Sequence, residues 1–295
     1  MSRETEKQQV ETTGHVWDGI EELNNPLPRW WLWTFYLTII WGIGYVIAYP
    51  AWPLISGATP GVLGYSTRAE VASEIARYDA ANSEIEARLA SAELTEISGD
   101  DALRQFSVNA GKAVFNTWCV QCHGVEGGLG AAGYPVLSDD DWLWGGDIEA
   151  VYQTVAHGIR SDDPDARFSE MPAFGEMLSK EEIAQVVAFV RTLSGGQADA
   201  AAASAGEQVF ADNCAACHGD DGTGMRDLGA PNLADSIWLY GGDEAVLTET
   251  VANARFGVMP AWSARLSEAD VRAVAVYVHG LGGGEASEAG AEASQ

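Results

Sequence analysis

The chain has 295 residues, which is enough for two domains of ordinary size or for one domain with additional segments. Acidic residues number 43 and basic residues 16, so the net charge is −27 at neutral pH. A charge of this size and sign disfavours binding to nucleic acid and to anionic lipid headgroups. All four cysteines belong to two copies of one short motif, so we expect no disulfide bond.

The amino-terminal part predicts a membrane anchor. Residues 1–29 carry six acidic and three basic side chains, unlike the positive start of a cleavable signal peptide. The stretch 30–52 is uncharged, and its roughly 20 residues before Pro50 are enough to cross the hydrocarbon core. We predict an uncleaved transmembrane helix at 30–52, with a buried helix of a soluble domain as the alternative. Aromatic residues near both ends resemble interfacial belts: Trp30, Trp31, Trp33, Tyr45, Tyr49 and Trp52.

Residues 53–101 are predicted to form a helical connector. The part from 68 to 97 is rich in Ala and Glu. Its apolar residues recur at helical spacings: Val71, Ile75, Tyr78, Ile85 and Leu89. The sequence leaves open whether this helix packs on the following domains or on another subunit.

A Cys-x-x-Cys-His motif carries the chemistry of the chain. The motif occurs twice, as Cys119, Cys122 and His123 and again as Cys214, Cys217 and His218. This pattern is the attachment site of c-type haem, in which both thiols bond to the haem and the imidazole binds its iron. A redox cysteine pair needs no following His, and a zinc site would spread its ligands over a different spacing. We therefore predict two covalent haem c groups.

The surroundings of the two motifs are also repeated. Gly111 and Phe115 match Gly206 and Phe210 at an offset of 95 residues. Beyond the motifs the offset is 96, as between the WLWGGD run at 142–147 and the WLYGGD run at 238–243, and it later falls to 88. The chain is thus a tandem duplication in which the second copy gains one residue and then loses eight.

We predict one haem domain at 102–196 and a second at 198–284, followed by a disordered tail at 285–295. Both domains are expected to be mainly α-helical, and few strands are indicated. Ser179 with Glu182, and Ser267 with Asp270, are predicted to begin the last helix of each copy.

The sixth ligand of each iron is predicted to be a methionine. Met171 and Met259 occupy equivalent positions, each followed by a proline that would stiffen its loop. A thioether opposite an imidazole raises the reduction potential and leaves no open position for a substrate. Ordinary core packing is the alternative role.

Other residues are weaker candidates. Met177 and Met225 are expected to be packing or surface residues, and His157 has Asn253 as its counterpart. The backbone carbonyls of Pro135 and Pro231 are candidates to accept the second imidazole proton and so orient each ligand, with a plain turn as the alternative.

Two resemblances add to these predictions. The repeated helices resemble those of class I cytochromes c, in which a Gly-x-x-x-Phe helix crosses a last helix with an aromatic residue. The aromatic residues that match are Phe189 and Tyr277. The segment HVWDGIEELNNPLPRWW at 15–31, placed before a membrane span and two such domains, resembles the dihaem subunit of cbb3-type cytochrome c oxidases, the CcoP or FixP family.

This second resemblance implies a function and partners. The chain would accept electrons from a soluble cytochrome c or the bc1 complex and pass them to the monohaem and haem-copper subunits of a terminal oxidase. It would have no active site of its own. The family also implies exchanged ligands, with Met259 on the first haem and Met171 on the second, whereas sequence order favours ligation within each copy. The single span, where some members have two, leaves contacts with small accessory subunits open.

Haem attachment outside the membrane predicts a topology. The chain is expected in a bacterial inner membrane, with its amino terminus cytoplasmic and its haem domains periplasmic. Beyond the span it has 13 basic and 37 acidic residues, a charge that either steers a basic partner or serves solubility. A free-standing anchored dihaem shuttle, and a dihaem peroxidase or gas sensor, are the competing functions.

Overall fold

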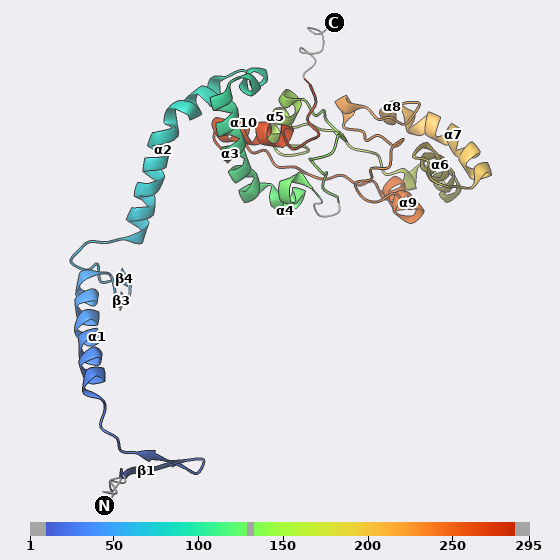
Figure 1. Ribbon diagram of the computed structural model, residues 1–295. Helices are drawn as coiled ribbons and strands as arrows, with labels where there is room; N and C mark the ends of the chain where they lie inside the picture. Colours follow the sequence, from blue (N-terminus) through green and yellow to red (C-terminus); the bar gives the residue numbers. More distant parts are fainter. Residues whose placement is uncertain (1–9, 129–132, 287–295) are drawn as a thin grey trace, which may run out of the picture. The chain divides into compact units, whose positions relative to one another are not determined.

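The computed structural model describes residues 10–128 and 133–286, and the described chain is mainly α-helical, as predicted (Figure 1). It forms two compact units, Met1–Ala81 and Asn82–Gln295, which are described separately. Helix α2 (Thr67–Ser91) runs across the division between them.

The first unit contains two small hairpins that the sequence analysis did not predict. Strands β1 (Thr12–Trp17) and β2 (Ile20–Leu23) are antiparallel, and β3 (Pro53–Leu54) pairs with β4 (Gly57–Ala58). The first hairpin turns at Asp18 and Gly19, whose φ angles are +49° and +85°. Asp-Gly is a favoured pair for such a turn, so the signal was present in the sequence.

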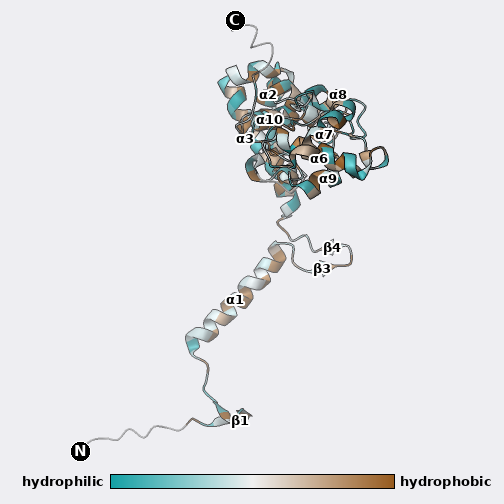
Figure 2. Ribbon diagram, turned by 90° about the vertical axis from the view of Figure 1, so that its right-hand side faces the viewer, coloured by the Kyte–Doolittle hydropathy of each residue, from teal (hydrophilic) through white to brown (hydrophobic). Residues whose placement is uncertain are grey.

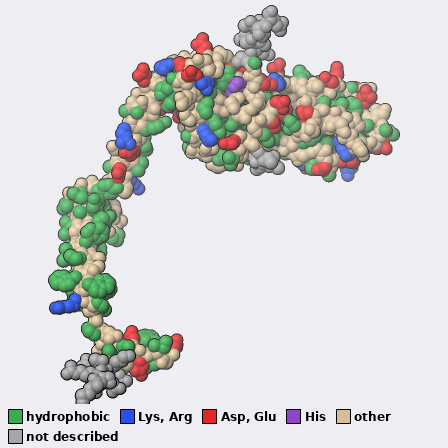
Figure 3. Space-filling view, in the orientation of Figure 1, with side chains coloured by type: hydrophobic (Ala, Val, Ile, Leu, Met, Phe, Trp, Pro, Cys, Tyr) green, Lys and Arg blue, Asp and Glu red, His purple; other side chains and the backbone are tan. Residues whose placement is uncertain are grey.

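Helix α1 (Arg29–Ala48) has the length and composition of a membrane span. Its 20 residues extend about 30 Å, and none of its side chains is buried. Figure 2 colours most of the helix from white to brown, and Figure 3 shows apolar side chains over its visible face, where they are exposed. The hydroxyls of Thr34 and Thr38 donate to the carbonyls of Trp30 and Phe35, so these polar groups are satisfied within the helix.

The second unit holds both copies of the repeat. The connector ends in η1 (Leu94–Gly99). The first copy forms α3 (Asp101–Trp118), α4 (Val120–His123), η2 (Val125–Gly127), α5 (Ile148–His157), η3 (Phe174–Glu176) and α6 (Lys180–Leu193). The second copy forms α7 (Ala200–Asn213), α8 (Ala215–His218), η4 (Arg226–Leu228), α9 (Glu244–Asn253) and α10 (Glu268–His279). Ser179 and Ser267 begin α6 and α10 as predicted, and Ser179 forms a capping box with Glu182.

The last helices of the two copies are exchanged. Helix α10 packs on α3 and α5 of the first copy, and α6 packs on α7 and α9 of the second (Figure 1). Helices α3, α5 and α10 form the first helical cluster, whose core joins Phe115 and Val155 to Trp262 and Tyr277. Helices α6, α7 and α9 form the second helical cluster, whose core joins Val186 and Val190 to Phe210. Each helical cluster is therefore built from both sequence repeats.

Glycines allow each exchanged pair to approach closely. A Cβ at Gly111 would collide with the Ala273 carbonyl, and a Cβ at Gly206 would collide with the Gln185 carbonyl. The aromatic partners follow the same pairing, with ring centroids 5.5 Å apart for Phe115 and Tyr277 and 5.2 Å for Phe189 and Phe210.

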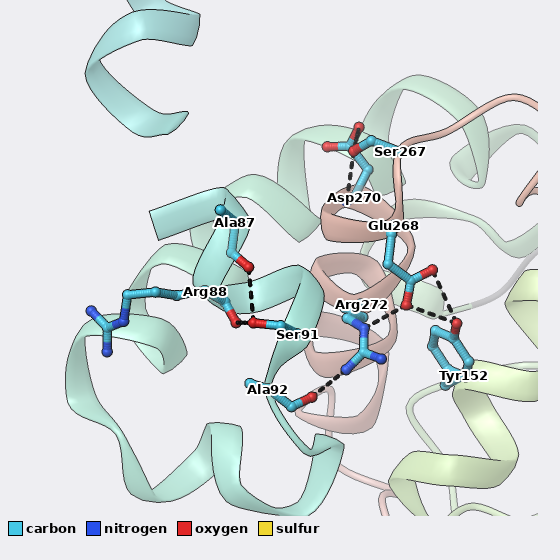
Figure 4. A network of polar contacts seen from close by, with 9 residues as sticks. All are labelled: Ala87, Arg88, Ser91, Ala92, Tyr152, Ser267, Glu268, Asp270 and Arg272. Atoms are coloured by element: carbon cyan, nitrogen blue, oxygen red, sulfur yellow. Dashed lines mark hydrogen bonds and ion pairs between the residues drawn. The ribbon is translucent and has the colours of Figure 1, made fainter. Parts of the chain in front are cut away.

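A polar network fastens α10 to the first copy and to the connector (Figure 4). Arg272 donates to the Ala92 carbonyl, which directly follows α2 in the connector, and pairs with Glu268. The Tyr152 hydroxyl of α5 donates to Glu268 at 2.9 Å. The end of α2 also contributes Leu89, which is fully buried in a cluster with Ala269 and Ala273. The last part of the connector, from Leu89 onward, therefore packs on the haem-motif unit of its own chain.

Candidate haem-binding sites

Each Cys-x-x-Cys-His motif forms a short helix just after the first long helix of its copy. The amide of Cys119 donates to Phe115 at 2.8 Å, and that of His123 donates to Cys119 at 3.0 Å. Gly124, with φ of +74°, then ends the turn, a conformation that favours glycine. The second motif repeats these contacts at 2.8 and 3.0 Å.

Both histidines are oriented by a proline carbonyl. His123 Nδ1 lies 3.0 Å from the Pro135 oxygen, and His218 Nδ1 lies 3.1 Å from the Pro231 oxygen. Burial lowers the pKa of both imidazoles, which favours the neutral form with its proton on Nδ1. The Nε2 atom of each ring then keeps a free lone pair, which is the arrangement that an iron ligand needs.

None of the four cysteines forms a disulfide bond, as expected. Burial, aided by the charge of Cys122, raises the pKa of Cys119 to about 11. Burial and Cys217 likewise raise the pKa of Cys214 to about 11. Both thiols are thus held in their uncharged form.

Met259 lies with the first motif. Its side chain packs against the core that also contacts Cys119. Its backbone pairs with Ile159 through two hydrogen bonds of 2.9 and 3.0 Å. A methionine from the second copy therefore belongs to the first helical cluster.

The segment that follows Met171 packs in the second helical cluster. Three residues after Met171, Phe174 is buried, and Gly175 approaches the Ala252 carbonyl of α9 closely. Leu178 then packs on a core that contains Leu247. The segment that follows Met171 is thus attached to α9 of the second copy, so both methionine loops are exchanged together with their helices.

The weaker candidates lie elsewhere. Met177 and Met225 are exposed. His157 Nδ1 is 3.0 Å from Asp163, in a loop that has no counterpart in the second copy. Of the predicted tail, Glu285 pairs with Arg226 at 2.5 Å, and residues 287–295 lie outside the described part of the chain.

Sequence reasoning missed two arginines near the methionine loops. Arg167 lies over the Trp144 ring, and Arg255 occupies the equivalent place over Tyr240, at 5.4 and 5.3 Å from the ring centroids. Both arginines stand four residues before a predicted methionine ligand, which is a signal that the repeat offered. The Nε of Arg167 is buried without a hydrogen-bond partner among the described residues, so this site has a donor ready for an acidic ligand.

Comparisons with known families match most of the chain. Residues 9–56 match the N-terminal domain of cytochrome oxidase-cbb3, FixP. Residues 108–194 match the cytochrome c family, and residues 201–278 match the family described as cytochrome c oxidase, cbb3-type, subunit III.

Similar proteins cover nearly the same length. The chain is 63% identical over 277 residues to the cbb3-type cytochrome c oxidase subunit CcoP of Cereibacter sphaeroides, covering 93% of this chain and 95% of the relative. It is 55% identical over 293 residues to CcoP of Rhodobacter capsulatus, covering 95% and 98%. With subunit FixP of Sinorhizobium medicae it shares 53% over 277 residues, covering 94% and 96%.

Proposed function

Because the chain belongs to the CcoP and FixP family of cbb3-type cytochrome c oxidase subunits, we propose that it is the membrane-anchored dihaem subunit through which electrons enter such an oxidase. Two haem c groups belong to its two cytochrome c domains, and its partners are the other subunits of the oxidase. The observation that carries the proposal is that each helical cluster brings together one motif histidine, oriented through Nδ1, and one methionine loop.

The residues present fit haem c. Cys119 and Cys122 would hold the first group and Cys214 and Cys217 the second, with His123 and His218 as the proximal ligands. The Arg167 Nε, which has no hydrogen-bond partner in the described part of the chain, suits a haem propionate, which is a carboxylate acceptor. When bound, haem c supplies a one-electron carrier.

The placement of the methionines supports electron transfer rather than catalysis on this chain. Met259 shares the core of the first motif, so it is assigned to the haem of His123. Met171 is assigned to the haem of His218, because the segment after it is fixed on α9. An imidazole and a thioether together leave no position for oxygen or peroxide.

The proposed direction of electron flow rests on the resemblance to this family. A soluble cytochrome c or the bc1 complex would supply the electrons, and the monohaem and haem-copper subunits would receive them. Helix α1 crosses the bacterial inner membrane in this proposal, with residues 1–29 in the cytoplasm and the haem domains in the periplasm. Covalent haem attachment outside the cytoplasm is the reason for this orientation.

A purification of tagged wild-type chain in mild detergent, beside Met171→Leu and Met259→Leu, tests the proposal. We expect all three proteins to co-purify with a copper-containing subunit and to stain for covalent haem. Each variant should lose the methionine–iron absorption of one haem, with a lower potential and new carbon monoxide binding at that haem.

Two results would contradict the proposal. Recovery of the wild-type chain alone would favour a free-standing electron shuttle. Rapid carbon monoxide binding to both haems of intact wild-type protein would show open sixth positions, as in a peroxidase or gas sensor.

A further inference from the structure

The two copies differ by an eight-residue segment whose position is informative. His157 aligns with Asn253 and Ala166 aligns with Ala254, so residues 158–165 exist only in the first copy. This segment lies between the end of α5 and the Met171 loop. A difference of this kind breaks the symmetry of the duplication at the point where the two methionine loops meet.

The backbone of the segment bonds to both loops. Ile159 forms a parallel bridge with Arg167 and an antiparallel bridge with Met259. The amide of Arg160 donates to the Arg167 carbonyl at 2.8 Å. Gly158 is required beside them, because its φ is +75° and a Cβ would collide with the Met259 carbonyl.

The side chain of Arg160 also bonds to both methionine loops. Its Nε donates to the Gly257 carbonyl at 2.7 Å, and its Nη1 donates to the Ser169 carbonyl at 2.6 Å. Each acceptor stands two residues before a methionine, Met259 in one case and Met171 in the other. The guanidinium also lies over the Phe256 ring, 5.7 Å from its centroid.

The surroundings of Arg160 favour this role over an ordinary ion pair. No carboxylate lies within 4.0 Å of Arg160 among the residues that the structure describes, and the charge of Glu170 acts on it from farther away. Its backbone φ of +52° is unusual for a residue with a side chain, so the fold holds it in a strained conformation. A planar guanidinium carries its N–H donors in a fixed fork, so it suits two carbonyl acceptors better than an ammonium does.

We propose that Arg160 is a positioning residue for both haem irons, acting as a clamp that the segment 158–165 places between the Met171 and Met259 loops. This inference depends on the proposed function, because it takes these methionines as the axial ligands. The clamp couples the sites, since a change that releases Arg160 frees both loops at once.

The test compares Arg160→Gln and Arg160→Lys with wild type in the full, haem-loaded oxidase. The signals of each haem are first assigned from Met171→Leu and Met259→Leu. We expect Arg160→Gln to weaken the methionine–iron absorption, lower the potential and admit carbon monoxide at both haems. Arg160→Lys should show a smaller effect at both, because an ammonium keeps the charge but not the fork. Arg191→Gln is the matched control, because Arg191 joins α6 to Glu244 at 2.9 Å, outside the methionine loops.

Arg160→Lys keeps the test of the clamp decisive if Arg160→Gln yields no folded protein, and a further variant tests the backbone of the segment separately. Gly158→Ala leaves the guanidinium in place and forces the chain away from the Met259 carbonyl. It should disturb the haem that Met259→Leu identifies more than the other haem.

Each contrary outcome has a distinct meaning. If each Met variant alters one haem but Arg160→Gln and Arg160→Lys alter neither, or only one, the shared clamp is wrong and the proposed function stands. If neither Met variant alters a haem, the proposed ligands are wrong, and the clamp falls with them.

Discussion

Aspartates from both copies gather beside the WLWGGD loop. Burial raises the pKa of Asp141 to about 6, and the charges of Asp235, Asp139 and Asp140 add to this shift. Asp139 and Asp235 occupy equivalent positions of the two repeats, so the exchanged fold brings like charges together. At neutral pH the folded chain therefore holds an ionised carboxylate that it accommodates poorly.

This arrangement predicts a pH-dependent effect of Asp141→Asn. The ordinary pKa of Asp is about 3.9, so the folded state binds more protons than the unfolded state between about pH 4 and pH 6. The stability that the protonated form provides is complete below that window and is lost as the pH rises through it. Asp141→Asn should raise the free energy of unfolding by about 1 kcal/mol at pH 7 and leave it unchanged at pH 4.

Urea unfolding of the detergent-solubilised haem protein, followed by circular dichroism, measures this difference. Asp79→Asn, on an exposed face of α2, is the control. An equal effect of Asp141→Asn at both pH values would show that repulsion at this carboxylate is not the cause.

At the scale of the elements, helix positions could be predicted and helix partners could not. Apolar spacing and capping residues identify α6 and α10, because these signals are local. The helices α3 and α7 both carry Gly-x-x-x-Phe, and α6 and α10 both present an aromatic residue, so either pairing suits the pattern. Which last helix pairs with which first helix depends on contacts made by the segments between helices, such as the bridge of Ile159 with Met259. Contacts of this kind leave no periodic pattern in the sequence.

The exchange predicts which haem responds to a change at a helix crossing. A Cβ at Gly111 would collide with Ala273 and lie 2.7 Å from the Tyr277 Cβ, both on α10. Overpacking of this kind costs roughly 1–3 kcal/mol. Because α10 follows Met259 in the chain, Gly111→Ala should weaken methionine–iron absorption at the haem that Met259→Leu alters. Gly206→Ala, at the crossing with α6, should act on the haem that Met171→Leu alters. The reverse assignment would mean that the helices pair in sequence order.

At the scale of the whole molecule, acidic side chains are scattered over the face of the second unit that Figure 3 shows. The sequence beyond α1 has 13 basic and 37 acidic residues, so its field attracts a cation and repels an anion. A docking partner with a basic surface would be steered by this field, and salt would screen it, because the Debye length falls from about 30 Å at 0.01 M to 10 Å at 0.1 M. If the acidic charge served solubility alone, the rate of docking would not depend on the sign of the partner's charge.

Stopped-flow reduction of the haem-loaded oxidase by two soluble cytochromes c, one basic and one acidic, separates these roles of the charge. We expect the rate with the basic donor to fall by about tenfold or more between low and physiological ionic strength, since steering contributes that much to association. The rate with the acidic donor should rise over the same range, because salt screens its repulsion. The acidic donor is thus the matched control, since it shares the redox chemistry and differs in the sign of its charge. Equal rates for both donors at every salt concentration would leave the acidic surface with a role in solubility only.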